Sequence, residues 1–276
     1  MRLVTYLAGG RRGVGVRQGD AVVDAGYPDM LDLIRDGAAG LARAAAAAAS
    51  GEPIPEARLV APLRPGKILC SGINYAGHVQ ENPDAKMPDE PFFFAKLPNA
   101  VSGPGDAIVI PTSETKTDWE VELSLVIGTR ATHVSAGNAM EHVFGYTLLN
   151  DVSARDVQFK DAQITLGKNP DGFCPLGPEL VTADEIADPG NLRVASYVNG
   201  EQMQSASTSE WLFPIPILIE AITRLITLEP GDVVSTGTPA GVGCFRNPPV
   251  YLQPGDEVTI EAEGIGRLTN PVVAGW

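Results

Sequence analysis

Two glutamates separated by one residue, Glu120 and Glu122, are the first candidates for chemistry in this sequence. Residues 118–127 alternate like a half-buried β-strand, with Trp119 and Val121 on one face and both glutamates on the other. Side chains two positions apart on a strand lie about 6.6 Å from each other. Two carboxylates held that close repel one another unless protons or a cation intervene. Oxygen ligands of this kind suit a hard divalent cation such as Mg²⁺, Mn²⁺ or Ca²⁺.

A third carboxylate follows the next apolar run. Asp151 comes after residues 144–149, which read as a strand. At that position an aspartate is either a turn residue or a ligand directed into a cleft. If it joins Glu120 and Glu122, the remaining positions of the ion stay open to water and substrate. Arg155 lies four residues later and would face the same way if the chain turns helical there.

A histidine and a glutamate form a second candidate group. His78 and Glu81 have the i, i+3 spacing of one helix face. A carboxylate beside a histidine fixes the ring and supports its protonated form, so the pair could act as a general base. The alternative is an ordinary surface helix with a neutral histidine. Residues 77–90, which include the pair, could act as a lid.

A glycine-rich segment near the C-terminus could bind an anion. Residues 237–243 read Gly-Thr-Pro-Ala-Gly-Val-Gly and follow a predicted strand. Backbone N–H groups and the Thr238 hydroxyl could serve a carboxylate there. The segment lacks the Gly-Lys-Ser/Thr ending of a nucleotide P-loop. As an isolated motif it would more often be a plain loop.

The elements that position these residues indicate two parts. Residues 2–27 read as short strands with tight turns, and residues 29–49 as a helix that Gly37 and Gly40 interrupt. A proline-rich stretch up to residue 66 follows. We therefore predict a small N-terminal domain over residues 1–62 and a β-rich catalytic domain over 63–276.

Several further signals concern the second part. Pro-Gly-Asp occurs at residues 104–106, 230–232 and 254–256, each time before a β-rich run, and predicts type II turns that lead into strands. Residues 167–178 predict a long ordered loop. Ser207 and Glu210 have capping-box spacing and predict the start of the longest helix, with a core-facing stripe up to Leu228.

Composition excludes some partners. The chain has 276 residues, 44% of them apolar and 20% charged, and a formal net charge of -14. This charge argues against nucleic acid or an anionic membrane surface as partner. Neither a membrane-spanning run nor a secretory pattern is visible, so we expect a cytoplasmic protein. The three cysteines lack metal-type spacing and suit reduced thiols.

Taken together, these motifs resemble the fumarylacetoacetate hydrolase (FAH) superfamily, and in particular its bacterial FAH-domain-containing proteins. The resemblance rests on residues 72–78, 118–123, 150–156, 228–233 and 236–243 and covers roughly residues 63–276 in the family's motif order. It implies an α+β, β-rich fold with an FAH-type mixed β-roll, a small N-terminal α/β domain and a homodimer. It also implies Mg²⁺ or a related ion held by Glu120, Glu122 and Asp151.

The resemblance further implies roles for individual residues. Family substrates are small anionic 2-oxo acids or their enols, so His78, with Glu81 as partner, would activate the attacking water. Lys168 would stabilise developing negative charge. The residues expected to bind substrate are Arg155, Gln158, Thr238 and Tyr75, although core packing explains Tyr75 equally well. Two departures from the family pattern are Val121, where many members have glycine, and residues 169–172.

The expected activity is metal-dependent hydrolysis of a C–C bond in a 2-oxo acid or β-diketone acid such as an acylpyruvate, a reaction of aromatic catabolism. The alternative is an isomerase or decarboxylase of the 2-hydroxyhepta-2,4-diene-1,7-dioate isomerase or oxaloacetate decarboxylase type. Retention of His78 and Glu81 favours hydrolysis or decarboxylation over simple tautomerisation. A third possibility, from another class, is a catalytically silent metal- or ligand-binding protein.

Overall fold

The computed structural model describes residues 1–82, 86–112, 115–160 and 162–275. Residues 83–85 of the segment considered as a lid lie outside these ranges. Within them the chain is a β-rich α+β protein with mixed sheets, which confirms the predicted class. Among the described residues, no helix is both long and apolar enough to cross a membrane.

One large sheet runs through most of the molecule in the order β3-β2-β1-β13-β11-β10-β16-β5-β6. Most neighbours are antiparallel, but β5 runs parallel to β16. Two further strands leave this path, since β4 pairs with β1 and β7 with β13. The strands are β1 (Arg2–Ala8), β2 (Arg11–Gln18), β3 (Ala21–Tyr27), β4 (Arg58–Val60), β5 (Ile68–Ser71), β6 (Phe93–Lys96), β7 (Val101–Ser102), β10 (Val121–Ile127), β11 (Val143–Asn150), β13 (Cys174–Thr182) and β16 (Val233–Ser235).

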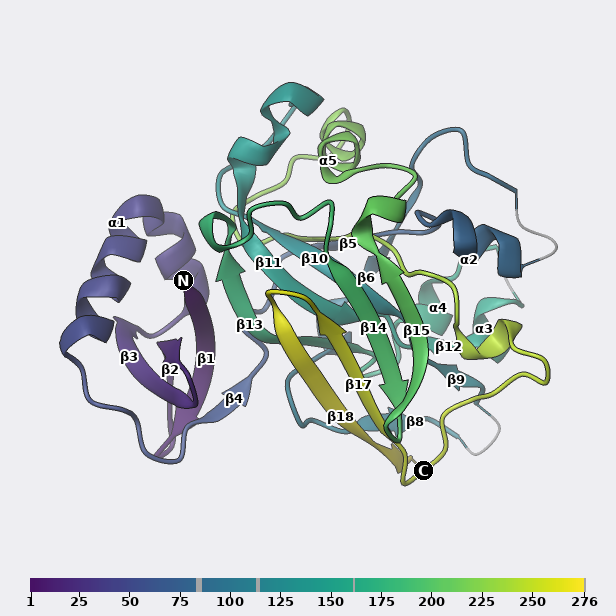
Figure 1. The fold of residues 1–276 in the computed structure, drawn as a ribbon, viewed down its shortest axis with the longest axis horizontal. Helices are drawn as coiled ribbons and strands as arrows, with labels where there is room; N and C mark the ends of the chain where they lie inside the picture. The colour runs from purple at the N-terminus through teal and green to yellow at the C-terminus, as the bar shows by residue number, and fades with distance from the viewer. Residues whose placement is uncertain (83–85, 113–114, 161, 276) are drawn as a thin grey trace.

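A second sheet lies in front of β10 and β11 in the view of Figure 1. Its order is β15-β14-β17-β18-β8, and a separate short pair joins β9 to β12. Leu123 and Leu125 of the first sheet share one apolar core with Val194, Ile260 and Leu268 of the second. These strands are β8 (Ile108–Ile110), β9 (Thr117–Asp118), β12 (Ser153–Ala154), β14 (Arg193–Val198), β15 (Glu201–Ser207), β17 (Glu257–Ala262) and β18 (Gly266–Ala274).

The N-terminal strands and helix α1 form one side of the molecule (Figure 1). Helix α1 (Met30–Ser50) begins at Asp29, whose side chain accepts a hydrogen bond from the N–H of Leu31, and it bends at Gly37, which has φ 55°. The predicted helix and its interruption are therefore confirmed. The large sheet crosses the predicted boundary at residue 62, because β1 pairs with β13. The division into two domains stays a prediction.

The remaining helices are short, and α2, α3 and α4 gather on the side of the molecule opposite α1 (Figure 1). They are α2 (Ala76–Glu81), α3 (Arg155–Gln158), α4 (Thr165–Lys168) and α5 (Ile215–Thr223). Short 3₁₀ helices cover Pro98–Ala100, Ala136–His142, Ala183–Glu185, Thr208–Glu210 and Gly243–Phe245. Helix α5 packs Ile215, Ile219 and Ile222 into the core, whereas α2, α3 and α4 carry polar side chains of the candidate site.

Two predictions about these elements are wrong. The capping box of Ser207 and Glu210 forms, but it caps the 3₁₀ turn Thr208–Glu210 rather than a long helix. Helix α5 begins only after Pro214 and ends at Thr223, so Leu225, at 93% exposure, lies beyond it and outside the core. The predicted loop 167–178 is also largely replaced, because α4 precedes it and β13 takes its second half.

Strand β10 carries the two glutamates of the candidate site at and near its start. All of its residues are buried, which corrects the prediction of a half-buried strand. One face of the strand packs in the core between the sheets, while Glu122 and Ser124 lie on the other face and are buried too. Strand β10 is therefore a central strand whose polar face points into the protein.

The three Pro-Gly-Asp sequences form the predicted turns. Gly105, Gly231 and Gly255 have φ values of 74°, 87° and 98°, as the third residue of a type II turn requires. In each turn the aspartate carboxylate accepts a hydrogen bond from the N–H three residues earlier. The turns lead into β8, β16 and β17.

Replacing Gly231 with alanine should destabilise the protein more than the same change at Gly105. Both positions have positive φ, which costs an alanine about 1–2 kcal/mol. A Cβ at Gly231 would lie 2.7 Å from Leu31 Cδ1, whereas one at Gly105 would meet nothing within 4 Å. Leu31 is half-buried and its Cδ1 can move aside, so we expect Gly231→Ala to lower the free energy of unfolding by only about 0.5–1.5 kcal/mol more than Gly105→Ala, the cost of displacing that side chain from its rotamer. Equal losses in chemical denaturation would contradict this.

Candidate metal centre and active site

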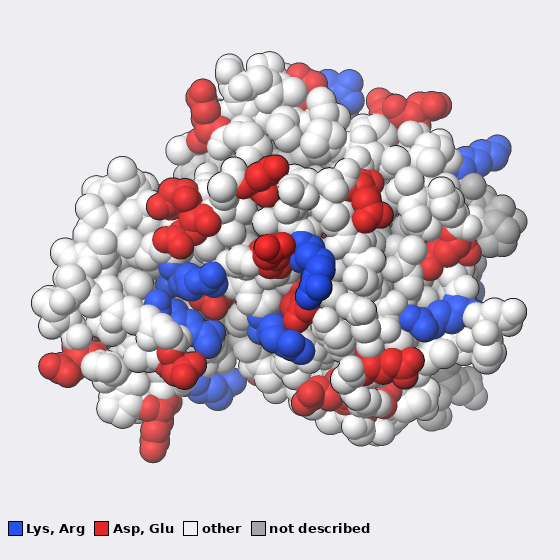
Figure 2. All heavy atoms as spheres, viewed as in Figure 1, with Lys and Arg blue, Asp and Glu red and all other residues white. Residues whose placement is uncertain are grey.

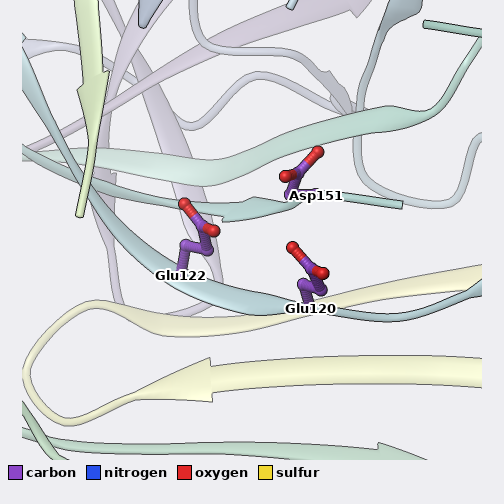
Figure 3. A group of neighbouring side chains, drawn as sticks. All are labelled: Glu120, Glu122 and Asp151. Atoms are coloured by element: carbon purple, nitrogen blue, oxygen red, sulfur yellow. The ribbon is translucent and has the colours of Figure 1, made fainter. Parts of the chain in front are cut away.

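Three buried carboxylates converge at the start of β10 and the end of β11. Glu120 and Glu122 project from the same face of the chain, and Asp151 follows the last residue of β11 (Figure 3). One oxygen from each lies within 4.8 Å of the others. The pairing of β10 with β11, in which Val121 faces Asn150, brings the third carboxylate to the first two. The structure thus brings together the three predicted ligands.

Glu122 is the member of this triad without a cationic partner among the described residues. Its Oε2 accepts hydrogen bonds from the hydroxyl of Ser235 and, at 3.2 Å, from the N–H of Gly237. Burial, followed by the charges of Asp151 and Glu120, holds the pKa of Glu122 well above its usual range. The carboxylate is therefore placed where an added positive charge would stabilise its ionised form.

Glu120 is in the opposite electrostatic situation. Its Oε1 lies 2.6 Å from Nη2 of Arg155, and its Oε2 lies 2.9 Å from Nζ of Lys168. Burial alone would raise the pKa of Glu120, but these two cations lower it to about 2. For Lys168, burial alone would lower the pKa, but the charges of Asp151 and Glu120 raise it to about 12. Glu120 is thus ionised and Lys168 is protonated at neutral pH.

Asp151 is held by two lysines. Its Oδ1 accepts a hydrogen bond from Lys96 Nζ and its Oδ2 from Lys168 Nζ, both at 2.6 Å. Lys96 also donates to the carbonyl of Val152 at 3.1 Å, and its side chain has no exposed surface. The sequence analysis did not identify Lys96. Lys96 is the last residue of the otherwise apolar strand β6. A lysine in such an apolar run is the sequence signal that could have identified it as a site residue.

Asp118 is a fourth buried carboxylate that the sequence analysis quoted without giving it a role. It accepts hydrogen bonds from Arg155 Nε at 2.9 Å and from the N–H groups of Gly243 and Cys244 at 2.7 and 3.0 Å. Alternation along residues 118–122 would have put it on the same face as the two glutamates. Asp118 thus fixes the arginine that contacts Glu120.

The charges of this region fit a divalent cation. Among the described residues, the buried carboxylates Asp118, Glu120, Glu122 and Asp151 face the buried cations Lys96, Arg155 and Lys168. The ion pairs leave Glu122 uncompensated, and the triad supplies only oxygen ligands. Hard divalent cations prefer such ligands. Glu120, Glu122 and Asp151 would hold the ion.

The candidate general base forms the predicted pair. His78 Nδ1 lies 2.6 Å from Glu81 Oε1 on helix α2. Because a carboxylate accepts hydrogen bonds, Nδ1 is the donor in this contact, and Nε2 is the ring nitrogen left to take a proton. Glu81 Oε2 in turn accepts a hydrogen bond from the N–H of Gly241 at 2.8 Å. Glu81, which is itself held by Gly241, therefore fixes the orientation of the His78 ring.

The glycine-rich segment binds anions, but in this structure they are the protein's own carboxylates. Gly237 donates its N–H to Glu122, Gly241 donates to Glu81, and Gly243 donates to Asp118. Binding of a ligand's carboxylate by this segment therefore stays a prediction. The segment connects the candidate metal ligands to the His78–Glu81 pair.

A pocket of about 200 Å³ opens beside the triad. Six polar residues line it. Asn82 was not predicted as a site residue, and the other five were: His78, Glu120, Arg155, Gln158 and Lys168. The guanidinium of Arg155 also donates from Nη1 to Gln158 Oε1 at 2.9 Å. The site residues therefore meet at one cavity, although their roles stay predictions.

Two predicted substrate-binding residues do not line this pocket. Thr238 is 2% exposed, and its hydroxyl accepts a hydrogen bond from Gln204 Nε2 at 2.8 Å. Tyr75 is 1% exposed and packed at the start of α2, and its hydroxyl has no hydrogen-bond partner among the described residues. The predicted contacts of Thr238 and Tyr75 with a substrate therefore stay predictions.

A larger hollow, of about 580 Å³, lies elsewhere on the surface. Its lining includes Arg2, Arg193 and Arg267, together with Glu261 and Glu263, and none of the triad or dyad residues. Arg267 and Arg193 are largely exposed and lie 3.1 and 3.8 Å from Glu261. On the face in Figure 2, basic side chains near the centre likewise lie beside acidic ones. The volume of a pocket therefore does not by itself identify the candidate active site.

Comparison with known proteins agrees with this site. A family model described as "Fumarylacetoacetate (FAA) hydrolase C-terminal" matches residues 67–273, and the chain belongs to that family. It is similar to oxaloacetate tautomerase FAHD2A, mitochondrial, of Bos taurus, with 43% identity over 289 residues that cover 99% of this chain and 92% of that protein. The predicted superfamily is therefore confirmed.

Solved structures share the fold over its whole length. Fumarylacetoacetate hydrolase from psychrophilic Exiguobacterium antarcticum has a TM-score of 0.89 and 38% identity, covering 99% of both chains. Maleylpyruvate hydrolase from Sphingobium sp. SYK-6, solved with manganese(II) ion and pyruvate, has a TM-score of 0.84 and 33% identity, covering 100% of both chains. These neighbours confirm the predicted FAH-type fold.

Two finer predictions gain no support from these relatives. The similarity to a bovine protein does not support a restriction to bacterial members of the family. That relative is named mitochondrial, so the cytoplasmic location stays a prediction. The homodimer and the preference for Mg²⁺ are likewise untested.

Replacing Glu122 with glutamine should separate metal binding from folding. The amide oxygen can still accept from Ser235 and Gly237, and the change removes an uncompensated buried charge, so the metal-free variant should melt at least as high as the metal-free wild type. Mn²⁺ should raise the melting temperature of the wild type far more than that of the variant. Thermal unfolding with and without Mn²⁺ measures both effects.

The matched control is Glu141→Gln on an exposed site, which should behave like the wild type. We expect Glu122→Gln to weaken Mn²⁺ binding by more than the roughly 10–100-fold that is typical when a residue hydrogen-bonded to a metal ligand is lost. Undiminished Mn²⁺ stabilisation of the Glu122 variant would remove this residue from the ligand set.

Replacing Lys96 with methionine should destabilise the metal-free protein strongly. Methionine has a similar length but cannot donate to Asp151, and removing one partner of a buried pair typically costs about 3–5 kcal/mol. Chemical denaturation should therefore show a loss of this order. Lys67→Met serves as control, because the exposed Lys67 pairs with Asp232 2.6 Å away outside the site. A loss at Lys96 no larger than at Lys67 would contradict the buried-pair argument.

Proposed function

We propose that this protein is a metal-dependent tautomerase that interconverts the keto and enol forms of oxaloacetate or a similar small 2-oxo acid. The observation that carries the proposal is a small pocket lined by His78, whose ring is held by Glu81, and by the cationic side chains of Arg155 and Lys168. Its volume of about 200 Å³ is below the usual range for drug-sized ligands and suits a substrate of few atoms. The 43% identity to an oxaloacetate tautomerase supports the same activity.

The reaction needs a base at carbon and positive charge at oxygen. In the keto-to-enol direction, His78 Nε2 takes a proton from C3 of the substrate, which leaves an enolate and a protonated ring. The ring then gives a proton to the enolate oxygen, directly or through water, and returns to its starting state, so atoms and charge balance. In the reverse direction the proton moves from the enol oxygen through His78 to C3. A divalent cation held by Glu120, Glu122 and Asp151 would polarise the 2-oxo group and lower the pKa of the neighbouring C–H.

The side chains around the base suit an anionic substrate. Lys168 and Arg155 keep positive charge at the pocket, although both are also paired with carboxylates of the site. Glu81 would stabilise the ring of His78 while it carries the extra proton. The apolar wall, which includes Phe92, Phe94 and Phe245, limits access of water to this proton.

A second candidate is the C–C bond hydrolysis that the sequence analysis put first. It is supported by the similarity to maleylpyruvate hydrolase, at 33% identity over the full chain, and by the same His78–Glu81 pair. In that reaction His78 would take its proton from water rather than from C3, and water would attack the acyl carbonyl. Decarboxylation of oxaloacetate would release CO₂ from the same site.

One assay series distinguishes these activities. Enol-oxaloacetate is offered with Mg²⁺ or Mn²⁺, and the decay of its ultraviolet absorbance is followed, together with CO₂ release. Acetylpyruvate is offered in parallel, and pyruvate formation is measured. We expect metal-dependent acceleration of enol decay without CO₂, abolished by a chelator. Pyruvate formation from acetylpyruvate would favour hydrolysis, and no turnover in any assay would favour a silent binding protein.

Replacing His78 with asparagine should lower the tautomerisation rate by about 10²–10⁴-fold, the usual contribution of a general base. Mn²⁺ affinity should stay close to that of the wild type, because His78 is not among the proposed ligands. His133→Asn is a matched control, since His133 is exposed and does not line the pocket. Full activity of the His78 variant would show that another group moves the proton.

A further inference from the structure

Four small side chains that can donate a hydrogen bond form a row across the large sheet beside Glu122. Thr147 of β11, Ser124 of β10, Ser235 of β16 and Cys70 of β5 are register partners in turn. None of the four has exposed surface. Ser124 lies two residues after Glu122 on β10, so both side chains are on the same face of that strand. The row therefore extends the polar side of the candidate metal centre into the protein interior.

The surroundings of this row are apolar. The positions two residues away on the same faces of these four strands are Ile68, Val126, Leu149 and Val233, and all four belong to one buried core. A hydroxyl buried in such a core costs free energy unless it is hydrogen-bonded. Packing alone therefore does not explain the serines of the row, and their hydrogen bonds are the feature to consider.

The hydrogen bonds of the two serines run in one direction, toward a candidate metal ligand. The hydroxyl of Ser124 donates to Oγ of Ser235 at 2.7 Å. The hydroxyl of Ser235 donates to Oε2 of Glu122. A hydroxyl has one proton, and Ser235 uses its proton on the carboxylate, so it acts as the acceptor for Ser124. The serine pair is thus a directed chain that ends on Glu122.

The two carboxylate oxygens of Glu122 have different surroundings. Oε2 accepts from the Ser235 hydroxyl and from the N–H of Gly237 at 3.2 Å. A carboxylate has about four lone-pair sites, which is about two for each oxygen, so these donors fill Oε2. Oε1 has neither a hydrogen-bond donor nor a cation beside it within the described ranges. The protein therefore holds one oxygen and leaves the other for a ligand.

This difference is specific to Glu122. All four carboxylate oxygens of Glu120 and Asp151 lie 2.6–2.9 Å from a lysine or arginine nitrogen. In the part of the chain that the structure describes, Oε1 of Glu122 is the one triad oxygen that no protein donor contacts. It is therefore the oxygen that is most readily available to a cation.

We infer that Ser235, supported by Ser124, is a positioning residue that makes Glu122 bind the cation through Oε1 alone and thereby favours Mn²⁺ or Mg²⁺ over Ca²⁺. The inference rests on the proposed function for the presence of a divalent cation. Ca²⁺ takes about six to eight oxygen ligands and often uses both oxygens of one carboxylate, whereas Mg²⁺ requires octahedral geometry. Holding Oε2 removes a ligand that Ca²⁺ would use.

Ser235→Ala tests the inference, because it frees Oε2 from the hydroxyl. The affinities of metal-free protein for Mn²⁺ and for Ca²⁺ are measured by calorimetry. We expect Mn²⁺ to bind about 10–100-fold more weakly, the usual loss when a hydrogen-bonding partner of a metal ligand is removed. Ca²⁺ affinity should fall much less, because Oε2 becomes available as a second ligand. The ratio of Mn²⁺ to Ca²⁺ affinity should therefore fall by about tenfold or more.

The affinity ratio separates positioning from general damage. A loosened site would weaken the binding of both cations alike and leave the ratio unchanged. An unchanged ratio in Ser235→Ala would therefore overturn the inference, whatever the loss of Mn²⁺ affinity.

Thr147→Val is the matched control. The Thr147 hydroxyl belongs to the same buried row, but it has no hydrogen-bond partner among the described residues. This variant should keep both affinities, because it removes a buried hydroxyl without changing the contacts of Glu122. A fall in the ratio as large as that of Ser235→Ala would show that packing in the row, and not the hydrogen bond to Glu122, determines the selectivity.

Ser124 tests the direction of the chain. Ser124→Ala should lower the ratio by a smaller factor, because Ser235 then loses its own donor but keeps its contact with Glu122. The double variant should match Ser235→Ala within about twofold, because Ser124 acts only through Ser235. Effects that multiply would contradict the directed chain. If Ser235→Ala does not fold, an unchanged ratio in Ser124→Ala overturns the inference instead.

The proposed function is tested separately. Wild-type protein that binds Mn²⁺ but does not tautomerise oxaloacetate contradicts the proposed activity and leaves the comparison of affinity ratios valid. Wild-type protein that binds neither cation contradicts both the metal-dependent activity and the role of Ser235.

Discussion

The concentration of buried carboxylates at one end of β10 is the constraint on which the rest of the structure depends. An ionised carboxylate is costly to bury unless it is paired and hydrogen-bonded. Asp118 forms an ion pair with Arg155, and Asp151 forms ion pairs with Lys96 and Lys168. Glu122 receives only a hydroxyl and an N–H. This uneven compensation makes Glu122 the carboxylate that gains most from an added cation.

The glycine-rich segment 237–244 connects the parts of the site. It leaves β16, contacts Glu122 first, then Gln204 through Thr238, then Glu81 and finally Asp118. Gly237 and Gly241 have positive φ values of 87° and 107°, which favour glycine, whereas Gly243 is required by space alone. A Cβ at Gly243 would lie 2.0 Å from the carbonyl oxygen of Val250 and 2.8 Å from Asp118 Oδ1. A shift of this one segment would disturb the ligands and the base together.

Local patterns in the sequence predict the parts of the site that depend on local geometry. Alternation puts Glu120 and Glu122 on one face, and helical spacing pairs His78 with Glu81, because both arrangements involve residues within a few positions. Contacts across the sheets were not predictable in this way. Lys96 of β6 reaches Asp151 after β11 although β5, β16 and β10 lie between these strands in the large sheet, and no local pattern encodes that order.

Competition between local signals explains the errors in the fold. The capping box at Ser207 and Glu210 is a true local signal, and it forms, but Pro214 sets the start of α5 four residues later. Residues 174–178 contain two prolines and a glycine and read as a loop, yet β11 and β7 pair with them on either side. Burial between two neighbours therefore outweighs the local turn preference there.

The members of this family named here act on 2-oxo acids or related compounds, and one arrangement of groups can serve both tautomerisation and hydrolysis. In either proposed reaction positive charge would stabilise an enolate, and the reactions would differ in whether His78 takes a proton from carbon or from water. The geometry behind His78 is the same for both, because Glu81 and Gly241 fix the ring from the protein side. The choice therefore depends on what fills the space in front of Nε2. Oxaloacetate and acetylpyruvate have the same number of non-hydrogen atoms, so a pocket of about 200 Å³ does not by itself decide between the two reactions. Hydrolysis needs a water placed between His78 and the acyl carbonyl, whereas tautomerisation needs only the C–H of the substrate itself. This smaller requirement, together with the 43% identity to a protein named as an oxaloacetate tautomerase, is the reason for placing tautomerisation ahead of hydrolysis.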